Sequence, residues 1–131
     1  MPHLTLEYTT NLDEWASDPG LILTLHRMLV SVAGIQIANC KSRWRMLDEW
    51  VVGDGEGESA FVHLDLRFLE GRPMSVKQAV GAGALEIIRA HLAPASDQLD
   101  LQITVEVQDI RKATYFKDPP GTLGPPTLSL V

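Results

Sequence analysis

The residue best placed to do chemistry is Pro2, which follows Met1 at the start of the strand-like run MPHLTLEY. Methionine aminopeptidase normally removes Met1 before a residue as small as proline, so we expect a mature chain that begins with a free secondary amine. An ordinary α-amine titrates near about 7.7–8.0, and burial or nearby cations lower that pKa. An amine tuned toward the working pH is an effective general base. Pro2 is therefore either an ordinary chain end or the catalytic base.

Cationic side chains form a second group of candidates. Lys41, Arg43 and Arg45 alternate in CKSRWR and would share one strand face of an acidic protein. They could pair with acidic residues of a neighbouring strand, or they could line a wall that binds an anion. Arg72 lies in the turn EGRP (70–73), and site residues concentrate in turns at strand ends. Its planar guanidinium suits a carboxylate, although without other information a solvated surface arginine is the better interpretation.

The other reactive side chains do not indicate metal or nucleophile chemistry. The histidines have no ligand spacing, so we expect no metal site. They are His3, His26, His63 and His91. His26 would lie in a helix and serve the core, and Cys40 is expected to be a buried structural thiol.

Composition narrows the class of protein. The chain has 131 residues, 45% of them hydrophobic and 21% charged, which is typical of one globular domain and argues against disorder. A net charge of −6 without a run of Lys, Arg and aromatics excludes nucleic-acid binding. The single cysteine excludes an internal disulfide, and we see no signal peptide or membrane span. We therefore expect a cytoplasmic protein that does not interact with membranes.

Hydrophobic periodicity predicts the elements of the first half. Alternation over residues 3–8 predicts a half-buried strand, followed by a polar segment at 9–17. Asp18 is a good N-cap for a helix that should end at Gly34. From residue 40 to 52 the pattern is extended but irregular, which predicts a long, bent strand.

The second half repeats this order after a glycine-rich acidic loop. Alternation over 61–68 predicts another strand, and a turn follows it. Ser75 and Gln78 have the spacing of a capping box, which would open a helix that ends near Pro94. Apolar residues alternate again over 101–107 and predict the last strand.

Two strand–helix–strand units predict an α+β fold. Right-handed crossovers place both helices on one face of a four-stranded mixed sheet. We expect one domain over residues 1–131, with a core at about 2–112 and a Pro/Gly-rich C-terminal tail at about 113–131. The other sheet face would be uncovered, and because 45% of the chain is hydrophobic we expect it to pack against another subunit.

Several segments together resemble a known family. In order and approximate spacing, they are MPHLTLEYTTNL, DPGL, KSRW, AFVHLDLRF, EGR and YFK. They resemble the 5-carboxymethyl-2-hydroxymuconate Δ-isomerase family of the tautomerase superfamily, over roughly residues 2–117. The tail is not matched.

The resemblance implies a tautomerase-like homotrimer that uses neither cofactor nor metal. It implies that Pro2 is the general base and that Arg72 engages a substrate carboxylate or the developing enolate oxygen. Lys41 stands where the family typically has arginine, so its single ammonium replaces a bidentate fork, and Arg43 could take over part of the substrate binding.

The implied reaction is ketonisation of 5-carboxymethyl-2-hydroxymuconate or a similar unsaturated 2-hydroxy acid in aromatic-acid breakdown. Another superfamily reaction, decarboxylation or dehalogenation of a small acid, is an alternative. A second arginine close after the first would favour it, but Pro73 and Met74 follow Arg72. A non-catalytic trimeric binding protein of the same fold is the remaining alternative.

Overall fold

The computed structural model describes residues 1–120, so most of the expected tail (121–131) lies outside the described residues. The first unit comprises β1 (His3–Thr9), α1 (Asp13–Ala16), α2 (Pro19–Ala33) and β2 (Lys41–Leu47). The second comprises β3 (Ser59–Leu69), α3 (Met74–His91), α4 (Ala93–Ser96) and β4 (Asp100–Ile110). Short 3₁₀ turns η1, η2 and η3 occupy Thr10–Leu12, Ile37–Asn39 and Lys112–Thr114.

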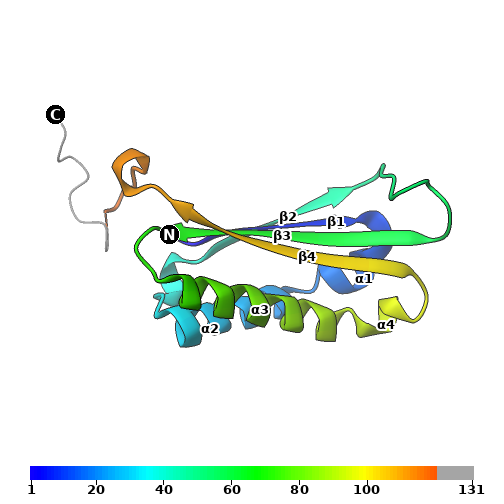
Figure 1. The fold of residues 1–131 in the computed structure, drawn as a ribbon, viewed down its shortest axis with the longest axis horizontal. Coiled ribbons are helices and arrows are strands. Elements are labelled where there is room, and N and C mark those ends of the chain that lie inside the picture. The colour runs from blue at the N-terminus through cyan, green and yellow to red at the C-terminus, as the bar shows by residue number, and fades with distance from the viewer. Residues whose placement is uncertain (121–131) are drawn as a thin grey trace.

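The four strands form one mixed sheet in the order β2-β1-β3-β4. β1 is parallel to β2 and β3 is parallel to β4, whereas the central pair β1 and β3 is antiparallel. Helices α2 and α3 lie side by side against one face of this sheet (Figure 1). The predicted α+β architecture of two βαβ units is therefore confirmed.

The core lies between the sheet and its two helices, and strand alternation builds it. Alternate strand residues turn inward and are almost completely buried: Leu4, Leu6 and Tyr8 on β1, and Val62, Leu64, Leu66 and Phe68 on β3. The helices contribute Leu21, Leu25, Leu29, Val80, Ala84 and Ile88. The buried strand residues recur at every second position, and the buried helix residues recur at helical spacing. Because these two sets of side chains pack against each other, they form one continuous apolar layer.

The two long helices begin in different ways. Asp18 accepts a hydrogen bond from the Gly20 N–H (3.0 Å), and Gly34 ends α2 with a φ of 65°, so both predicted signals are confirmed. The predicted capping box of α3 is wrong. Pro73 is the N-cap, and its backbone oxygen accepts from the N–H groups of Val76 and Lys77 (3.0 and 3.3 Å). Ser75 already lies inside the first turn, where its side chain caps nothing.

The predicted long strand over 40–52 is also wrong, since β2 ends at Leu47. Leu47 pairs with Thr9, the last residue of β1, so no neighbouring strand continues beyond that point to bond residues 48–52. The segment 9–17 is more ordered than its polarity indicates. It contains η1 and α1, and Ala16 is buried and accepts a hydrogen bond from Trp44 Nε1 (2.8 Å).

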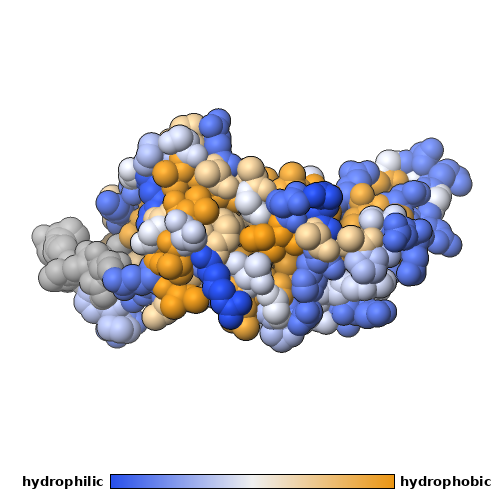
Figure 2. Space-filling model, turned by 90° about the horizontal axis from the view of Figure 1, so that it is seen from below, coloured by the Kyte–Doolittle hydropathy of each residue, from blue (hydrophilic) through white to orange (hydrophobic). Residues whose placement is uncertain are grey.

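The sheet face without helices is mostly polar along the middle of its strands, with Phe61 and Ile110 near its ends. The residues between the inward-facing ones are His3, Thr5 and Glu7 on β1, Lys41, Arg43 and Arg45 on β2, His63, Asp65 and Arg67 on β3, and Thr104, Glu106 and Gln108 on β4. On the helix side, Figure 2 shows exposed apolar areas interrupted by charged groups. Many of the hydrophobic residues lie in the core, and others, among them Leu23, Trp44 and Met46, remain exposed.

Candidate active site

A cavity of about 170 Å³ lies at the N-terminal end of β1, and three chain segments line it. Met1 and Pro2 form one wall, the connection between α2 and β2 forms the second, and the end of β3 with the following turn forms the third. The lining residues beyond the N-terminus are Gly34, Ile35, Gln36, Asn39, Phe68, Leu69 and Arg72.

The sheet topology explains why these segments meet. In the antiparallel pair, His3 lies opposite Arg67, so one further step places Pro2 opposite Phe68 and just before the turn that carries Arg72. In the parallel pair, His3 lies opposite Lys41, so the connection that precedes β2 arrives beside Pro2. Figure 1 shows the N-terminus and the β3–α3 turn at the same end of the sheet. Residues distant in sequence thereby form one site.

Arg72 is held in place at this cavity by two contacts. Its Nε donates a hydrogen bond to the backbone oxygen of Ala33 (3.0 Å), and its guanidinium carbon lies 5.0 Å from the ring centroid of Phe68. A cation over an aromatic face is favourable, and both contacts orient the planar fork. Among residues 1–120, the two terminal nitrogens of Arg72 have no hydrogen-bond partner. They are therefore available to an anion in the cavity.

The terminal amine occupies an environment that disfavours its charged form. The nitrogen of Met1 donates to the backbone oxygen of Asn39 (3.4 Å), and Lys41 Nζ donates to the same oxygen (3.1 Å). Burial, followed by the charges of Lys41 and Lys117, lowers the pKa of this amine from 8.0 to about 6. An amine at this end of β1 is thus largely neutral at pH 7.

The structure places Lys41 and Lys117 near the amine, and sequence reasoning missed Lys117 as a candidate. Lys117 belongs to the segment YFK that follows η3, and its charge contributes to the lowered pKa. The signal available in the sequence was this short motif near the end of the chain. Lys117 lies more than one hundred residues from Pro2 in the sequence. The two come close only because β4 runs alongside β3.

Arg43 lies on the other side of the sheet from this cavity. Arg43 Nη2 donates to His3 Nδ1 (2.7 Å), and the residue lines a separate cavity on the open face. Arg45, two positions further along, reaches Glu7 at 3.9 Å, as the cross-strand interpretation predicts. The structure therefore brings Pro2, Arg72 and Lys41 to one end of the sheet, and within one chain it separates Arg43 from them.

The remaining histidines and the cysteine lie elsewhere and have local partners. His26 is close to Ser42 (2.6 Å), His63 to Thr104 (2.7 Å) and His91 to Asp18 (3.1 Å). Burial raises the pKa of the half-buried Cys40 thiol. Between residues 1 and 120, no three His, Cys, Asp or Glu side chains come close enough to hold a metal ion. In the same range, no helix has the length and apolarity needed to cross a membrane.

The arrangement suits proton transfer within a bound anion. A mostly neutral amine can accept a proton, and a fixed guanidinium can stabilise negative charge that develops beside it. The apolar lining from Ile35, Phe68 and Leu69 keeps the amine partly dehydrated.

Comparison with known proteins identifies a family of isomerases. Residues 2–120 match the family described as 5-carboxymethyl-2-hydroxymuconate isomerase. A 5-carboxymethyl-2-hydroxymuconate Delta-isomerase from Escherichia coli is 29% identical over 117 residues, which cover 89% of this chain and 93% of the relative. The crystal structure of a 5-carboxymethyl-2-hydroxymuconate isomerase from Deinococcus radiodurans R1 is 32% identical with a TM-score of 0.80, and the match covers 88% of this chain and 87% of that one.

More distant structures share the fold alone. A fused 4-OT wild-type symmetric trimer is 20% identical with a TM-score of 0.62, covering 88% of this chain and 90% of that chain. The tautomerase-like fold expected from the sequence is confirmed.

Proposed function

The chain belongs to the 5-carboxymethyl-2-hydroxymuconate isomerase family, and from that premise we propose that it ketonises an unsaturated 2-hydroxy acid with the amine of Pro2 as general base. The enzyme is an isomerase. Its substrate would be 5-carboxymethyl-2-hydroxymuconate or a similar acid from aromatic-acid breakdown, and the reaction would need no cofactor. The observation that carries this proposal is the cavity shared by Pro2 and Arg72 beside an amine of lowered pKa.

Removal of Met1 is the first requirement of this mechanism. While Met1 is attached, the nitrogen of Pro2 is an amide without a basic lone pair. Met1 itself is buried, with only 5% of its surface exposed, and it lines the cavity. Cleavage would free the secondary amine and vacate the space beside it. Pro2 would then meet the same burial and the same cations that lower the pKa of the Met1 amine.

In the reaction, Pro2 nitrogen would take the proton of the substrate's 2-hydroxyl group. Negative charge then spreads through the conjugated system, and the prolinium returns the proton to a carbon atom further along it. No atom is gained or lost. Arg72 would stabilise the dienolate and bind a carboxylate with its free terminal nitrogens, and Lys41 would supply a second positive charge.

The family assignment also favours a homotrimer in the cytoplasm. A protein of the same fold, the fused 4-OT protein, is a symmetric trimer. The Pro2 cavity lies at the end of the sheet, next to the connection that leads into the edge strand β2. A neighbouring subunit that met this edge would come close to the cavity and could help to cover it.

The experiment compares the ultraviolet loss of 2-hydroxymuconate by three forms whose N-termini are verified by intact mass. These are the processed chain, its Pro2→Ala variant and a form that retains Met1. We expect the Pro2→Ala variant to lose about 10²–10⁴-fold in rate, the usual contribution of a positioned general base. The Met1-bearing form should lose at least as much, because its Pro2 is an amide. Equal rates for the processed and Met1-bearing forms would contradict the mechanism.

A further inference from the structure

The segment that follows β4 returns to the end of the sheet where the Pro2 cavity lies, and Figure 1 shows this coil at the same end as the N-terminus. Its first contact is with the turn between β3 and α3. The backbone N–H of Lys112 donates to Glu70 Oε2 (2.8 Å), and the backbone N–H of Glu70 donates to the oxygen of Ile110 (2.9 Å). Glu70 comes two residues before Arg72, so the segment is joined to the wall of the cavity that carries this arginine.

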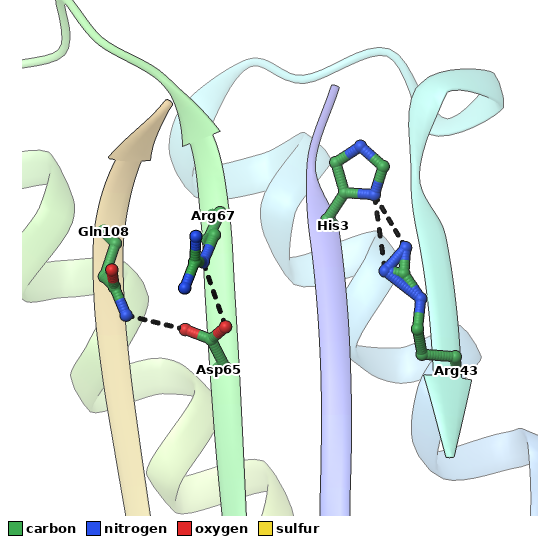
Figure 3. A network of polar contacts seen from close by, with 5 residues as sticks. All are labelled: His3, Arg43, Asp65, Arg67 and Gln108. Carbon is green, nitrogen blue, oxygen red and sulfur yellow. Dashed lines mark hydrogen bonds and ion pairs between the residues drawn. The ribbon is translucent and has the colours of Figure 1, made fainter. Parts of the chain in front are cut away.

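A second contact joins the segment to the start of β1. Arginine can only donate, so the contact from Arg43 Nη2 to His3 Nδ1 (2.7 Å, Figure 3) makes Nδ1 the acceptor. The proton of the neutral ring is then on Nε2, which donates to the Tyr115 hydroxyl oxygen (2.7 Å). The two rings also meet edge to face, with their centroids 5.8 Å apart. Tyr115 is therefore held beside His3, the residue that follows Pro2.

These contacts bring Lys117 near the terminal amine. Lys117 follows Tyr115 by two residues, and its charge acts together with that of Lys41 to lower the pKa of the amine. The half-buried side chain donates from Nζ to the backbone oxygen of Pro119 (2.7 Å), which uses one of its three hydrogens. Within residues 1–120, no carboxylate forms a salt bridge with Lys117. Its charge and two of its hydrogens are therefore available to an anion.

The cations around Pro2 form two separate centres. Arg72 follows β3, on one side of β1, whereas Lys41 begins β2 on the other side. Neighbouring strands lie about 4.8 Å apart, so β2 and β3 are separated by roughly 10 Å. One carboxylate is too short to contact both centres. An acid with a carboxylate at each end of a conjugated chain is long enough to do so.

We propose that Lys117 is a specificity-determining residue that binds, together with Lys41, the substrate carboxylate remote from the one that Arg72 holds. This proposal rests on the proposed function, because it concerns the substrate of the same site. A single ammonium group cannot make the bidentate contact of an arginine. Two ammonium groups can bind one carboxylate oxygen each, so Lys117 completes the contact that Lys41 alone cannot make. The site should therefore select acids with two carboxylates over acids with one.

Two acids that the enzyme cannot ketonise test this selection. The compounds trans,trans-muconate and sorbate have the same conjugated chain and no 2-hydroxyl group, and a methyl group of sorbate replaces one carboxylate of muconate. NMR titration of the processed, ¹⁵N-labelled full-length protein at constant ionic strength measures both affinities. We expect shifts at Gln36, Leu69 and Arg72, which line the cavity. Muconate should bind at least about tenfold more tightly than sorbate, the usual effect of one hydrogen bond between charged groups.

Variants assign the preference to Lys117. Lys117→Gln removes the charge and should weaken muconate binding about tenfold, while sorbate binding stays nearly unchanged. Lys117→Arg keeps the charge and should retain most of the preference. Lys77→Gln is the matched control, because it removes the same charge from a lysine that is paired with Asp109 (3.2 Å), and it should leave both affinities unchanged. Urea unfolding checks that each variant is folded.

Kinetics at pH 8, where the amine is neutral, separate substrate binding from an effect on the base. With 2-hydroxymuconate, Lys117→Gln should raise KM about tenfold and change kcat little. With 2-hydroxypenta-2,4-dienoate, which lacks the second carboxylate, both constants should stay close to those of the unsubstituted enzyme. A loss that is confined to kcat at low pH would show that Lys117 only adjusts the amine, and would overturn the proposal.

Two binding results would also overturn it. One is an equal loss of muconate and sorbate affinity in Lys117→Gln, and the other is the same loss of muconate affinity in Lys77→Gln. The titrations need neither a basic Pro2 nor turnover. Failure of the proposed function would therefore appear as absent activity, and failure of this proposal as muconate binding that does not depend on Lys117.

Discussion

The two faces of the sheet are made from alternate residues of the same strands, yet they provide opposite environments. Leu64 is completely buried beneath the helices, and its neighbour Asp65 lies on the open face among polar groups. The same alternation separates Pro2 from His3. Pro2 is buried next to Phe68, whereas His3 joins a network of arginine and tyrosine side chains.

This difference shows where each kind of chemistry can occur. Burial against apolar side chains makes the charged form of an amine costly, so the helix-covered side can produce a neutral base at pH 7. On the open side, water and neighbouring side chains solvate charges. That side can therefore hold several charged side chains close together, as the pairs of Arg45 with Glu7 and of Arg67 with Asp65 show.

The largest expected effect contrasts the two neighbours on β3. Leu64→Ala should lower the free energy of unfolding by about 2–5 kcal/mol, because it opens a cavity in the close-packed core. Asp65→Ala should cost less than about 1 kcal/mol, because its ion pair with Arg67 is partly exposed to solvent. Urea unfolding followed by circular dichroism measures both. Similar losses would mean that the open face is covered and packed in the assembled protein.

The next effect concerns the arginines of the two faces. Arg72→Gln should reduce kcat/KM for a 2-hydroxymuconate about 10²-fold, as is usual when a donor to a developing oxyanion is removed. Arg45→Gln, on the open face, should leave it nearly unchanged, because that side chain is exposed and paired with Glu7. Initial rates over a range of substrate concentrations separate the two, and unfolding curves check that each variant is folded. A comparable loss of kcat/KM in Arg45→Gln would contradict a specific role of Arg72 in the reaction.

The smallest effect is electrostatic and concerns the terminal amine. In the Met1-bearing chain this amine should titrate near 6 instead of 8.0. Lys41→Gln should raise its pKa, because a nearby cation that disfavours the ammonium form is gone. The increase should be only partial, since burial is the largest cause of the shift. An NMR titration of the terminal nitrogen measures it directly.

The processed enzyme provides a second measurement of the same effect. If the neutral amine is the active form, a higher pKa moves the acidic limb of the kcat/KM profile to higher pH. Lys41→Gln should then lose more activity at pH 6 than at pH 8. Lys77→Gln is the control, because Lys77 pairs with Asp109 and does not contribute to the amine's pKa. An unchanged acidic limb in Lys41→Gln would show that the charge of Lys41 does not affect the pKa of the catalytic base.

Elements whose signals are local were predictable from the sequence. The alternation of β1 and β3 and the caps of α2 at Asp18 and Gly34 depend on neighbouring residues, and the structure confirms them. The length of β2 was not predictable in this way. A strand continues only while a partner strand is present to bond it, and β1 ends opposite Leu47. For α3, the backbone oxygen of Pro73 accepts the first hydrogen bonds of the helix, and the side chains of Ser75 and Gln78 form no capping box.

The sequence by itself determined which residues could react and which face of each strand would be buried. Both depend only on residue type and on the alternation of polar and apolar residues along a strand. Only the tertiary structure decided which of these residues meet. The antiparallel pairing of β1 with β3 brings Pro2 beside the turn of Arg72, and the alternation of the same strand turns His3 toward Arg43 on the far face. Strand pairing joins residues that are distant in sequence, and no local pattern specifies the partner.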